Sequence, residues 1–424
     1  MSTRAVSSGK RLTPPPSQML KRRLRFDTER LPHLPVELWL LIFQLATEVP
    51  FAFLPRSESP FDLPPRPTHK ELTAELSYSL LTKRHLVLVC KTWNGIATPL
   101  LYSTILLRTT RGVTAAWNTF RSSAESNTGI RLGHYVKRID LSMRDSRVHH
   151  LTTEQDAERK KVTEILHWLP NLSIFTMHTK LRGGDATCIA DALTETSAST
   201  LQTIEWGRGH MFGHVCLSGE SWTKLTSSCP NLKSLDGPAC RILLTELHPT
   251  AQLDHLSVMR DHRIEGIEDI SPDPPVPLHV RYDSTDAWDI SHSTTQTYCS
   301  GAISLDVDFR GRHALYQLLA QCPKLSQLIL RISSWSSIPR LTLDSSITHL
   351  GLFIDQKQPR LPFMVEGLRC LIGWSIPGVK TLRLMSRHPL LEGENLERRR
   401  IREALHKIWA AGLVLENWEG KPFT

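Results

Sequence analysis

Apolar residues follow two different spacings along this chain. Between Leu34 and Ala46 large apolar side chains recur every three or four positions, which is the spacing of one helical face. After Trp117 they recur in the form L-x-x-L-x-L, whose last two positions lie two residues apart and therefore share one face of a strand. The pattern predicts a helical N-terminal part and a longer part that contains strands.

The first predicted helix carries more apolar surface than a single core contact needs. Pro35 suits the first turn of a helix, where its missing N–H costs nothing. Trp39 and Phe43 widen a stripe that recurs at helical spacing and consists of Leu38, Leu41, Ile42 and Leu45. A helix so broadly apolar has to be covered on more than one side.

A proline-rich stretch follows this helix. Six prolines lie between Pro50 and Pro67, and neither a helix nor a central strand tolerates that density. The sequence T-H-K-E from Thr68 has the form of a capping box, so a further helix is expected there, followed by helices at about 86–93 and 96–102. We assign a helical module to residues 31–106, with a proline-rich insertion at 47–82.

The strand pattern returns many times, at irregular steps. Its copies begin at Val136, Leu172, Leu201, Leu253, Leu325, Ile347 and Val379, with a partial copy at Leu232 and a weaker one at Ile303. Helical stretches are predicted before several copies, at 158–169, 188–196, 221–229, 313–322 and 363–374. A proline then ends four of these helices, as in L-P-N-L at Leu169. The recurring unit is helix, proline turn, strand.

These units predict an arc of parallel strands with helices on its outer side, at residues 135–424, after a connector at 107–134. The prolines between Pro272 and Pro277 are expected to form a loop in the arc. An amphipathic helix near the C-terminus should cap it, and a partner-binding basic helix is the alternative. The inner strand faces are the default binding surface, with Trp206, His178 and Arg383 as candidates to line it.

Charge changes this picture little. The net charge is +9, but residues 1–30 hold eight basic side chains against two acidic ones, so the other 394 residues carry only +3. We therefore expect a disordered basic tail at 1–30 and no nucleic-acid partner, although K-R-R-L-R from Lys21 could act as a weak nuclear signal. Since the sequence has no apolar run of membrane-spanning length, we expect no membrane partner and a cytoplasmic or nuclear location.

The candidate chemical motifs are weak. Eight cysteines without a C-x-x-C pair favour reduced thiols over disulfides or zinc. Glu164 with His167 and Glu403 with His406 have a spacing found in some metal sites, but the companion carboxylate helices of such sites are not expected here. The glycines after residue 206 miss the dinucleotide-binding spacing. We expect no catalytic, cofactor or metal site, and an enzyme with a cryptic site is the least favoured hypothesis.

The helical module resembles an F-box domain. The resemblance rests on L-P-x-E-L from Leu34, on I-F at Ile42, and on L-V-x-V-C-K-x-W ending at Trp93. The proline-rich insertion resembles that of fungal F-box proteins, and the later part is similar to the leucine-rich-repeat-like region that often follows an F-box. The fold class this implies is α/β, with a small helical F-box module followed by an irregular leucine-rich-repeat-like solenoid.

The resemblance also implies partners. An F-box binds a Skp-type adaptor and through it a cullin, which would make this chain the substrate adaptor of an SCF-type ubiquitin ligase that presents an unknown protein substrate on the arc. Eight residues would supply the adaptor contact or hold it in shape, namely Leu34, Pro35, Leu38, Ile42, Phe43, Val87, Cys90 and Trp93. The alternatives are that these residues form only an internal core, and that the chain is an interaction scaffold unconnected with ubiquitin transfer.

Overall fold

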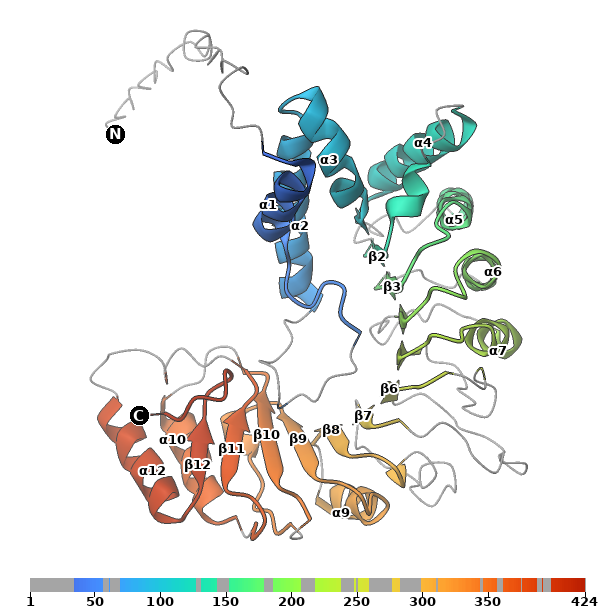
Figure 1. Cartoon of the computed structure of the whole chain (residues 1–424). Helices are drawn as coiled ribbons and strands as arrows, with labels where there is room; N and C mark the ends of the chain where they lie inside the picture. Colours follow the sequence, from blue (N-terminus) through green and yellow to red (C-terminus); the bar gives the residue numbers. More distant parts are fainter. Residues whose placement is uncertain are drawn as a thin grey trace, which may run out of the picture.

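A computed structural model gives the fold. It describes residues 34–55, 61, 69–126, 131–142, 152–178, 186–206, 218–237, 248, 251–258, 277–282, 299–309, 312–343, 346–356, 361–374, 376–386, 391 and 398–423. These residues form a mixed α/β protein around one 12-stranded parallel sheet, in which the strands follow one another in chain order (Figure 1). The strands are β1 (Thr104–Leu107), β2 (Arg138–Leu141), β3 (Ile174–Met177), β4 (Thr203–Trp206), β5 (Ser234–Asp236), β6 (His255–Val258), β7 (His279–Tyr282), β8 (Ser304–Asp308), β9 (Gln327–Ile332), β10 (His349–Ile354), β11 (Thr381–Leu384) and β12 (Val414–Glu416).

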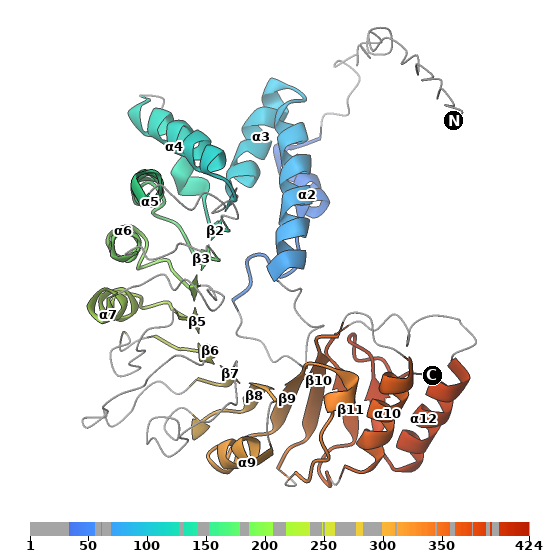
Figure 2. The same cartoon turned by 180° about the vertical axis from the view of Figure 1, so that it is seen from behind.

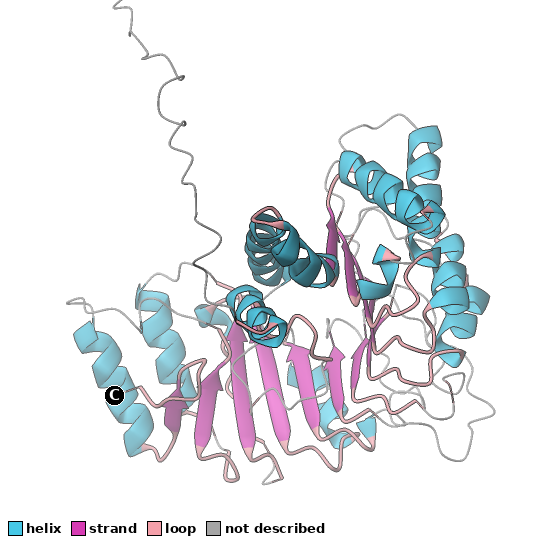
Figure 3. Ribbon diagram, turned by 45° about the horizontal axis from the view of Figure 1, so that its top comes forward, coloured by secondary structure: helices cyan, strands magenta, loops and turns pink. Residues whose placement is uncertain are grey.

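Helices cover one face of this sheet and three more helices precede it. The preceding ones are α1 (Val36–Thr47), α2 (His69–Val87) and α3 (Lys91–Tyr102). Those on the outer face are α4 (Thr110–Glu125), α5 (Thr152–His167), α6 (Thr187–Thr196), α7 (Gly219–Ser227), α9 (Arg312–Ala320), α10 (Leu361–Ile372) and α12 (Arg398–Ala410). Because a helix is about 10 Å wide and strands lie about 4.8 Å apart, the outer layer is longer than the sheet, and the sheet bends into an arc (Figures 1 and 3).

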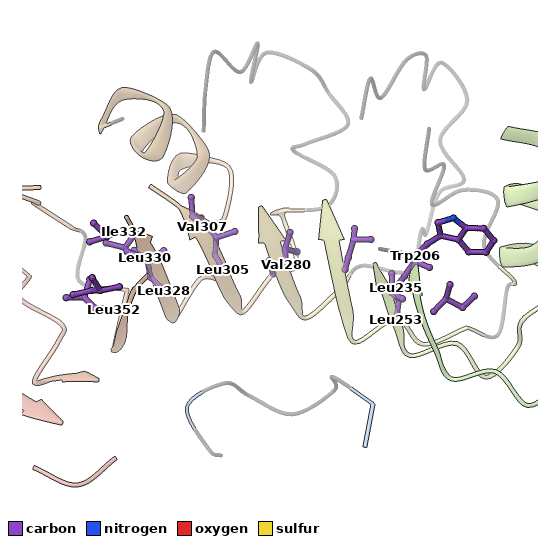
Figure 4. Close-up of a cluster of buried hydrophobic side chains, with 14 of the residues drawn as sticks. Trp206, Leu235, Leu253, Val280, Leu305, Val307, Leu328, Leu330, Ile332 and Leu352 are labelled. Carbon is purple, nitrogen blue, oxygen red and sulfur yellow. The ribbon is translucent and has the colours of Figure 1, made fainter. Parts of the chain in front are cut away.

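The register of the strands explains the repeated sequence pattern. One position of each strand aligns across the sheet and points to the helices, and along β2 to β12 each of these side chains is 1% exposed or less. The aligned residues are Ile139, Phe175, Ile204, Leu235, Leu256, Val280, Leu305, Leu328, Leu350, Leu382 and Leu415. Figure 4 shows four of them, Leu235, Val280, Leu305 and Leu328. Stacking each copy on its neighbour builds a continuous core that no single copy could bury alone.

The turn between helix and strand repeats its hydrogen bonds. Asn171 donates from Nδ2 to the carbonyl oxygen of His134 at 2.8 Å, and Asn231, two turns further along, donates to that of Ser199 at 2.7 Å. Each bond ties a turn to the turn before it and satisfies a carbonyl that lies outside the strand ladder. The P-N-L motif therefore both ends a helix and joins neighbouring units.

The predicted strands are confirmed at every full copy of the pattern and at the two weaker copies, but three strands were missed. β1 lies within the predicted helical module, and α4 occupies the predicted connector at 107–134, so the sheet begins about thirty residues earlier than predicted. β7 lies in the stretch between the copies at 253 and 325, and β12 follows the C-terminal helix. Strands of three or four residues show no period by themselves, and β2 to β6, which are equally short, were found only through the repeated L-x-x-L-x-L copies.

Other predictions need correction. The insertion does not extend to residue 82, because α2 begins at His69, and the helix expected at 86–93 is instead split by a turn between α2 and α3. Trp206 does not line the inner face, since its ring lies in the core 5.4 Å from Phe175 and 6.0 Å from Trp222. The tail at 1–30, the capping residue Thr68, three of the four clustered prolines and the glycines after residue 206 lie outside the described residues.

The C-terminal helix is amphipathic as predicted. α12 buries Ile401, Leu405 and Ile408 beside α10, and Arg399 and Arg402 are exposed on its other side. In the described part of the chain, no helix combines the length and the apolarity needed to cross a membrane.

The cysteines differ sharply in environment, which gives a chemical test of the fold. Cys188 is exposed on α6, whereas Cys229 is buried and its burial raises the pKa of its thiol to about 12. Because iodoacetamide reacts with the thiolate, we expect Cys188 to be alkylated at least ~100 times faster than Cys229 at pH 8 in the folded protein. Mass spectrometry of the tryptic peptides measures both rates, and equal rates would contradict the described packing.

Candidate docking surface

The three N-terminal helices pack around a cluster of aromatic rings. The ring centroids of Phe43 and Trp93 lie 4.8 Å apart, and those of Trp39 and Trp93 lie 5.0 Å apart. This cluster joins one face of α1 to the start of α3. Contacts of this kind stabilise a pair of rings beyond the area that they bury.

Hydrogen bonds fix the same three helices. Ser79 on α2 donates to the carbonyl oxygen of Thr47 at 2.6 Å, at the end of α1. Asn94 donates from Nδ2 to the carbonyl of Val87 at 3.0 Å, across the turn between α2 and α3. Cys90 is the N-cap of α3, and its Sγ accepts from the backbone N–H of Trp93 at 3.5 Å. These contacts, together with the aromatic cluster, join the three helices to one another within the chain.

The opposite face of α1 is apolar and open. Four of the 12 residues of this helix are large apolar side chains that lie on this face and are 43–65% exposed, namely Leu38, Leu41, Ile42 and Leu45. Glu37 is the only charged residue in the helix. Scattered exposed apolar residues are ordinary, but a row of them along one helix marks an interaction surface.

Two further exposed residues lie in the turn before α3. Leu88 and Val89 are among the most exposed apolar side chains described, and this turn directly precedes Cys90 and Trp93. Since Trp93 contacts Trp39, the turn lies at the end of α3 that packs on α1. We define the docking face as the exposed row of α1 together with Leu88 and Val89.

The structure separates the eight predicted contact residues into three groups. Leu38, Ile42 and Pro35 are exposed, whereas Phe43 is buried at 1% exposure and serves the internal core. The remaining four, Leu34, Val87, Cys90 and Trp93, are half-buried. The interpretation that all eight form only internal core is wrong for the exposed ones.

Part of the docking face was not in the predicted set. Leu41 and Leu45 belong to the predicted stripe, so the same helical spacing could have included them. Leu88 and Val89 were missed because a helix was expected at 86–93, where the structure has a turn. Val36, at the start of α1, is also exposed, but it lies three residues before Trp39 and seven before Phe43, and therefore on the side of the aromatic cluster.

Polar contacts hold the module directly on the sheet. Arg108, just after β1, donates from Nη2 to the carbonyl oxygen of Thr73 and to Oγ of Ser77, both at 2.7 Å. The Nζ of Lys83 on α2 lies 3.5 Å from Oγ of Ser103, and burial lowers the pKa of this lysine. The docking face therefore has a fixed position relative to β1.

The described residues hold little that resembles a reaction centre. A depression of about 660 Å³ between α3 and α4 is lined by amides, hydroxyls and apolar groups, and Tyr135 is the one titratable side chain among the described residues that line it. Glu164 accepts from Nε1 of Trp117 at 2.5 Å, and His167 lies 3.3 Å from Oγ1 of Thr196, so this pair makes structural contacts. No cluster of three possible metal ligands occurs within the described ranges.

The fold and this surface define an α/β protein with a three-helix module at one end of a parallel sheet. No protein-family model matches the sequence, and no curated protein matches it.

Proposed function

We propose that this chain is the substrate-recognition subunit of an SCF-type cullin-RING ubiquitin ligase. In this proposal the three-helix module is an F-box that binds a Skp-type adaptor, and the curved sheet with its outer helices is a leucine-rich-repeat-like solenoid that presents a protein substrate. The chain performs no chemistry itself and raises the concentration of its substrate near the ligase, in the cytoplasm or nucleus.

One observation carries the proposal. α1 has two apolar faces, of which one is used by the aromatic cluster with Trp93 and the other is exposed. An apolar helical face of this length, with a single charge, fits a groove formed by partner helices. The resemblance of L-P-x-E-L and V-C-K-x-W to the F-box names the partner, because in that family the first helix and the segment before the last helix form one docking module.

Co-expression with a Skp-type adaptor tests the proposal. The full chain should co-purify with the adaptor, and the double substitution Leu38→Asp plus Ile42→Asp should weaken binding at least ~100-fold, because two apolar anchors become buried charges. The matched control is Phe363→Asp, which introduces the same charge at a residue 45% exposed on α10, away from the docking face. Far-ultraviolet circular dichroism checks that each variant is folded.

Two outcomes would contradict the assignment. Retained binding by the folded double variant would mean that α1 is not the contact. A folded wild-type chain that fails to bind the adaptor would favour the other candidate function, a non-catalytic interaction scaffold outside ubiquitin ligases, which the same exposed face of α1 equally supports.

A further inference from the structure

The inner face of the sheet changes character along the arc. From β2 to β8 the inward-facing position aligned across the sheet is polar or charged in each strand, with Asp140, Thr176, Glu205, Asp236, Ser257, Arg281 and Asp306. On β9 and β10 the same position is Ile329 and Gly351. An apolar patch on an otherwise polar binding face marks a place where an apolar group is received.

A residue from the insertion fills this patch. Phe61 is 6% exposed and packs against Ile329, Met385 and Phe353, in a small cluster separate from the main core. Its ring centroid lies 5.4 Å from that of His349. We call the receiving residues the aromatic socket, which comprises Ile329, His349, Phe353, Arg383 and Met385.

Arg383 adds polar recognition to the socket. Its guanidinium carbon lies 5.8 Å from the ring centroid of Phe61, and its Nη1 donates a hydrogen bond to the backbone carbonyl of the same residue. Its Nε donates to Glu416 at 3.1 Å, which fixes the direction of the guanidinium. The socket thus recognises an aromatic ring and the backbone carbonyl of the same residue, two features that any peptide with an aromatic side chain possesses.

Gly351 gives the socket its shape. A Cβ at this position would lie 2.9 Å from Cγ of Met385 and 3.1 Å from Cγ1 of Ile329. A larger residue would therefore push both walls aside. Because glycine has no side chain, Met385 can lie over β10 at Gly351 and pack against the ring of Phe61.

The segment that carries Phe61 has a second attachment at the other end of the arc. The carbonyl oxygen of Ala52 accepts a hydrogen bond from Nη1 of Arg138 on β2, at 2.7 Å. Residues 51–55 run on the inner side of the arc, as Figures 1 and 2 show. Phe61 lies nine positions after Ala52, and a segment of that length spans at most about 30 Å when extended. Ala52 and Phe61 therefore contact opposite parts of the inner face, which an external protein would otherwise contact.

We propose that the aromatic socket is a recognition site for an extended peptide that carries an aromatic side chain, and that Phe61 is an internal occupant which such a peptide displaces. The inference concerns the inner face and does not depend on adaptor binding by α1. A tethered occupant acts at an effective concentration of the order of millimolar, so it excludes external peptides that bind only weakly. Displacement would also release the insertion from β9 to β11.

A short peptide of this chain is a direct probe. Residues 57–63, SESPFDL, contain Phe61 as their only aromatic residue. A fluorescently labelled SESPFDL should bind the full-length Phe61→Ala protein at least ~10 times more tightly than it binds the wild type, measured by fluorescence anisotropy. The matched control is Phe53→Ala, which removes a ring 40% exposed in the same segment and should behave as the wild type does.

Further variants separate a recognition site from a structural brace. The peptide SESPADL, and the protein with Arg383→Gln added to Phe61→Ala, should both lose binding. If Phe61→Ala does not fold, Phe61→Leu keeps an apolar occupant without its ring contacts and should bind SESPFDL with an affinity above that of the wild type. Equal binding of SESPFDL and SESPADL, or no gain in either folded Phe61 variant, would overturn the proposal and leave Phe61 as a brace.

Discussion

Replacing Asp140 by alanine is expected to lower the free energy of unfolding by about 3–5 kcal/mol. The carboxylate accepts two hydrogen bonds from Arg138, at 2.9 Å from Nε and 3.1 Å from Nη2, and both side chains are buried. Burial raises the pKa of Asp140, and the adjacent guanidinium opposes that rise. Removing the carboxylate leaves an arginine charge buried without its counter-ion, which is far more costly than losing an ordinary hydrogen bond.

Urea denaturation followed by circular dichroism measures this effect, and two controls define it. Glu125→Ala removes a partner from the exposed pair of Arg121 and Glu125, whose side chains are 53% and 64% exposed, and should cost less than about 1 kcal/mol. The double substitution Arg138→Met plus Asp140→Leu should recover more than half of the loss, because no unpaired charge remains. A cost below about 1 kcal/mol for Asp140→Ala would show that the pair is not buried as described.

Gly133→Ala is expected to be the most damaging single-methyl change. A Cβ at this residue would lie 1.8 Å from the carbonyl oxygen of Trp168 and 2.9 Å from its carbon, and backbone atoms cannot rotate away. The turn before β2 would have to move from the end of α5. We expect a loss of at least about 2–3 kcal/mol in the free energy of unfolding, measured in urea.

Gly95→Ala is the matched control for this change. Gly95 lies inside α3, and a Cβ there would have no neighbour within 4 Å. Alanine should therefore stabilise the protein by about 0.5–1 kcal/mol, because glycine weakens a helix interior. Similar effects of the two substitutions would contradict the close approach at Gly133.

The sheet was largely predictable because its core repeats. Copies such as Leu325, Leu328 and Leu330 keep the same spacing, and in a stacked fold the same spacing puts each apolar residue beside its counterpart in the next strand. β1 was not predictable in this way, because Thr104–Leu107 follows α3 directly and its short apolar run continues that of the helix. The prediction of one helix at 86–93 was wrong for a related reason, because the apolar residues Leu88 and Val89 in the turn have the same spacing as a helical face.

The docking face was only partly predictable. Helical spacing identifies the stripe of Leu38, Leu41, Ile42 and Leu45, but it cannot tell which side of α1 meets α3, because Trp39 and Phe43 on the other side are equally apolar. The aromatic socket gave no sequence signal at all. Phe61 lies in a proline-rich segment more than 260 residues before Ile329, and only the three-dimensional fold brings the two residues into contact.

The junction between α3 and β1 consists of one residue, Ser103, whose carbonyl oxygen accepts from the backbone N–H groups of Lys137 and Arg138 at 3.0 and 3.1 Å. Such a junction leaves no hinge between the docking face and the sheet. Under the proposed function, a protein bound to the sheet would therefore have one orientation and one distance relative to the rest of the ligase. Which of its lysines are modified would then be determined by the orientation in which the captured protein binds the sheet.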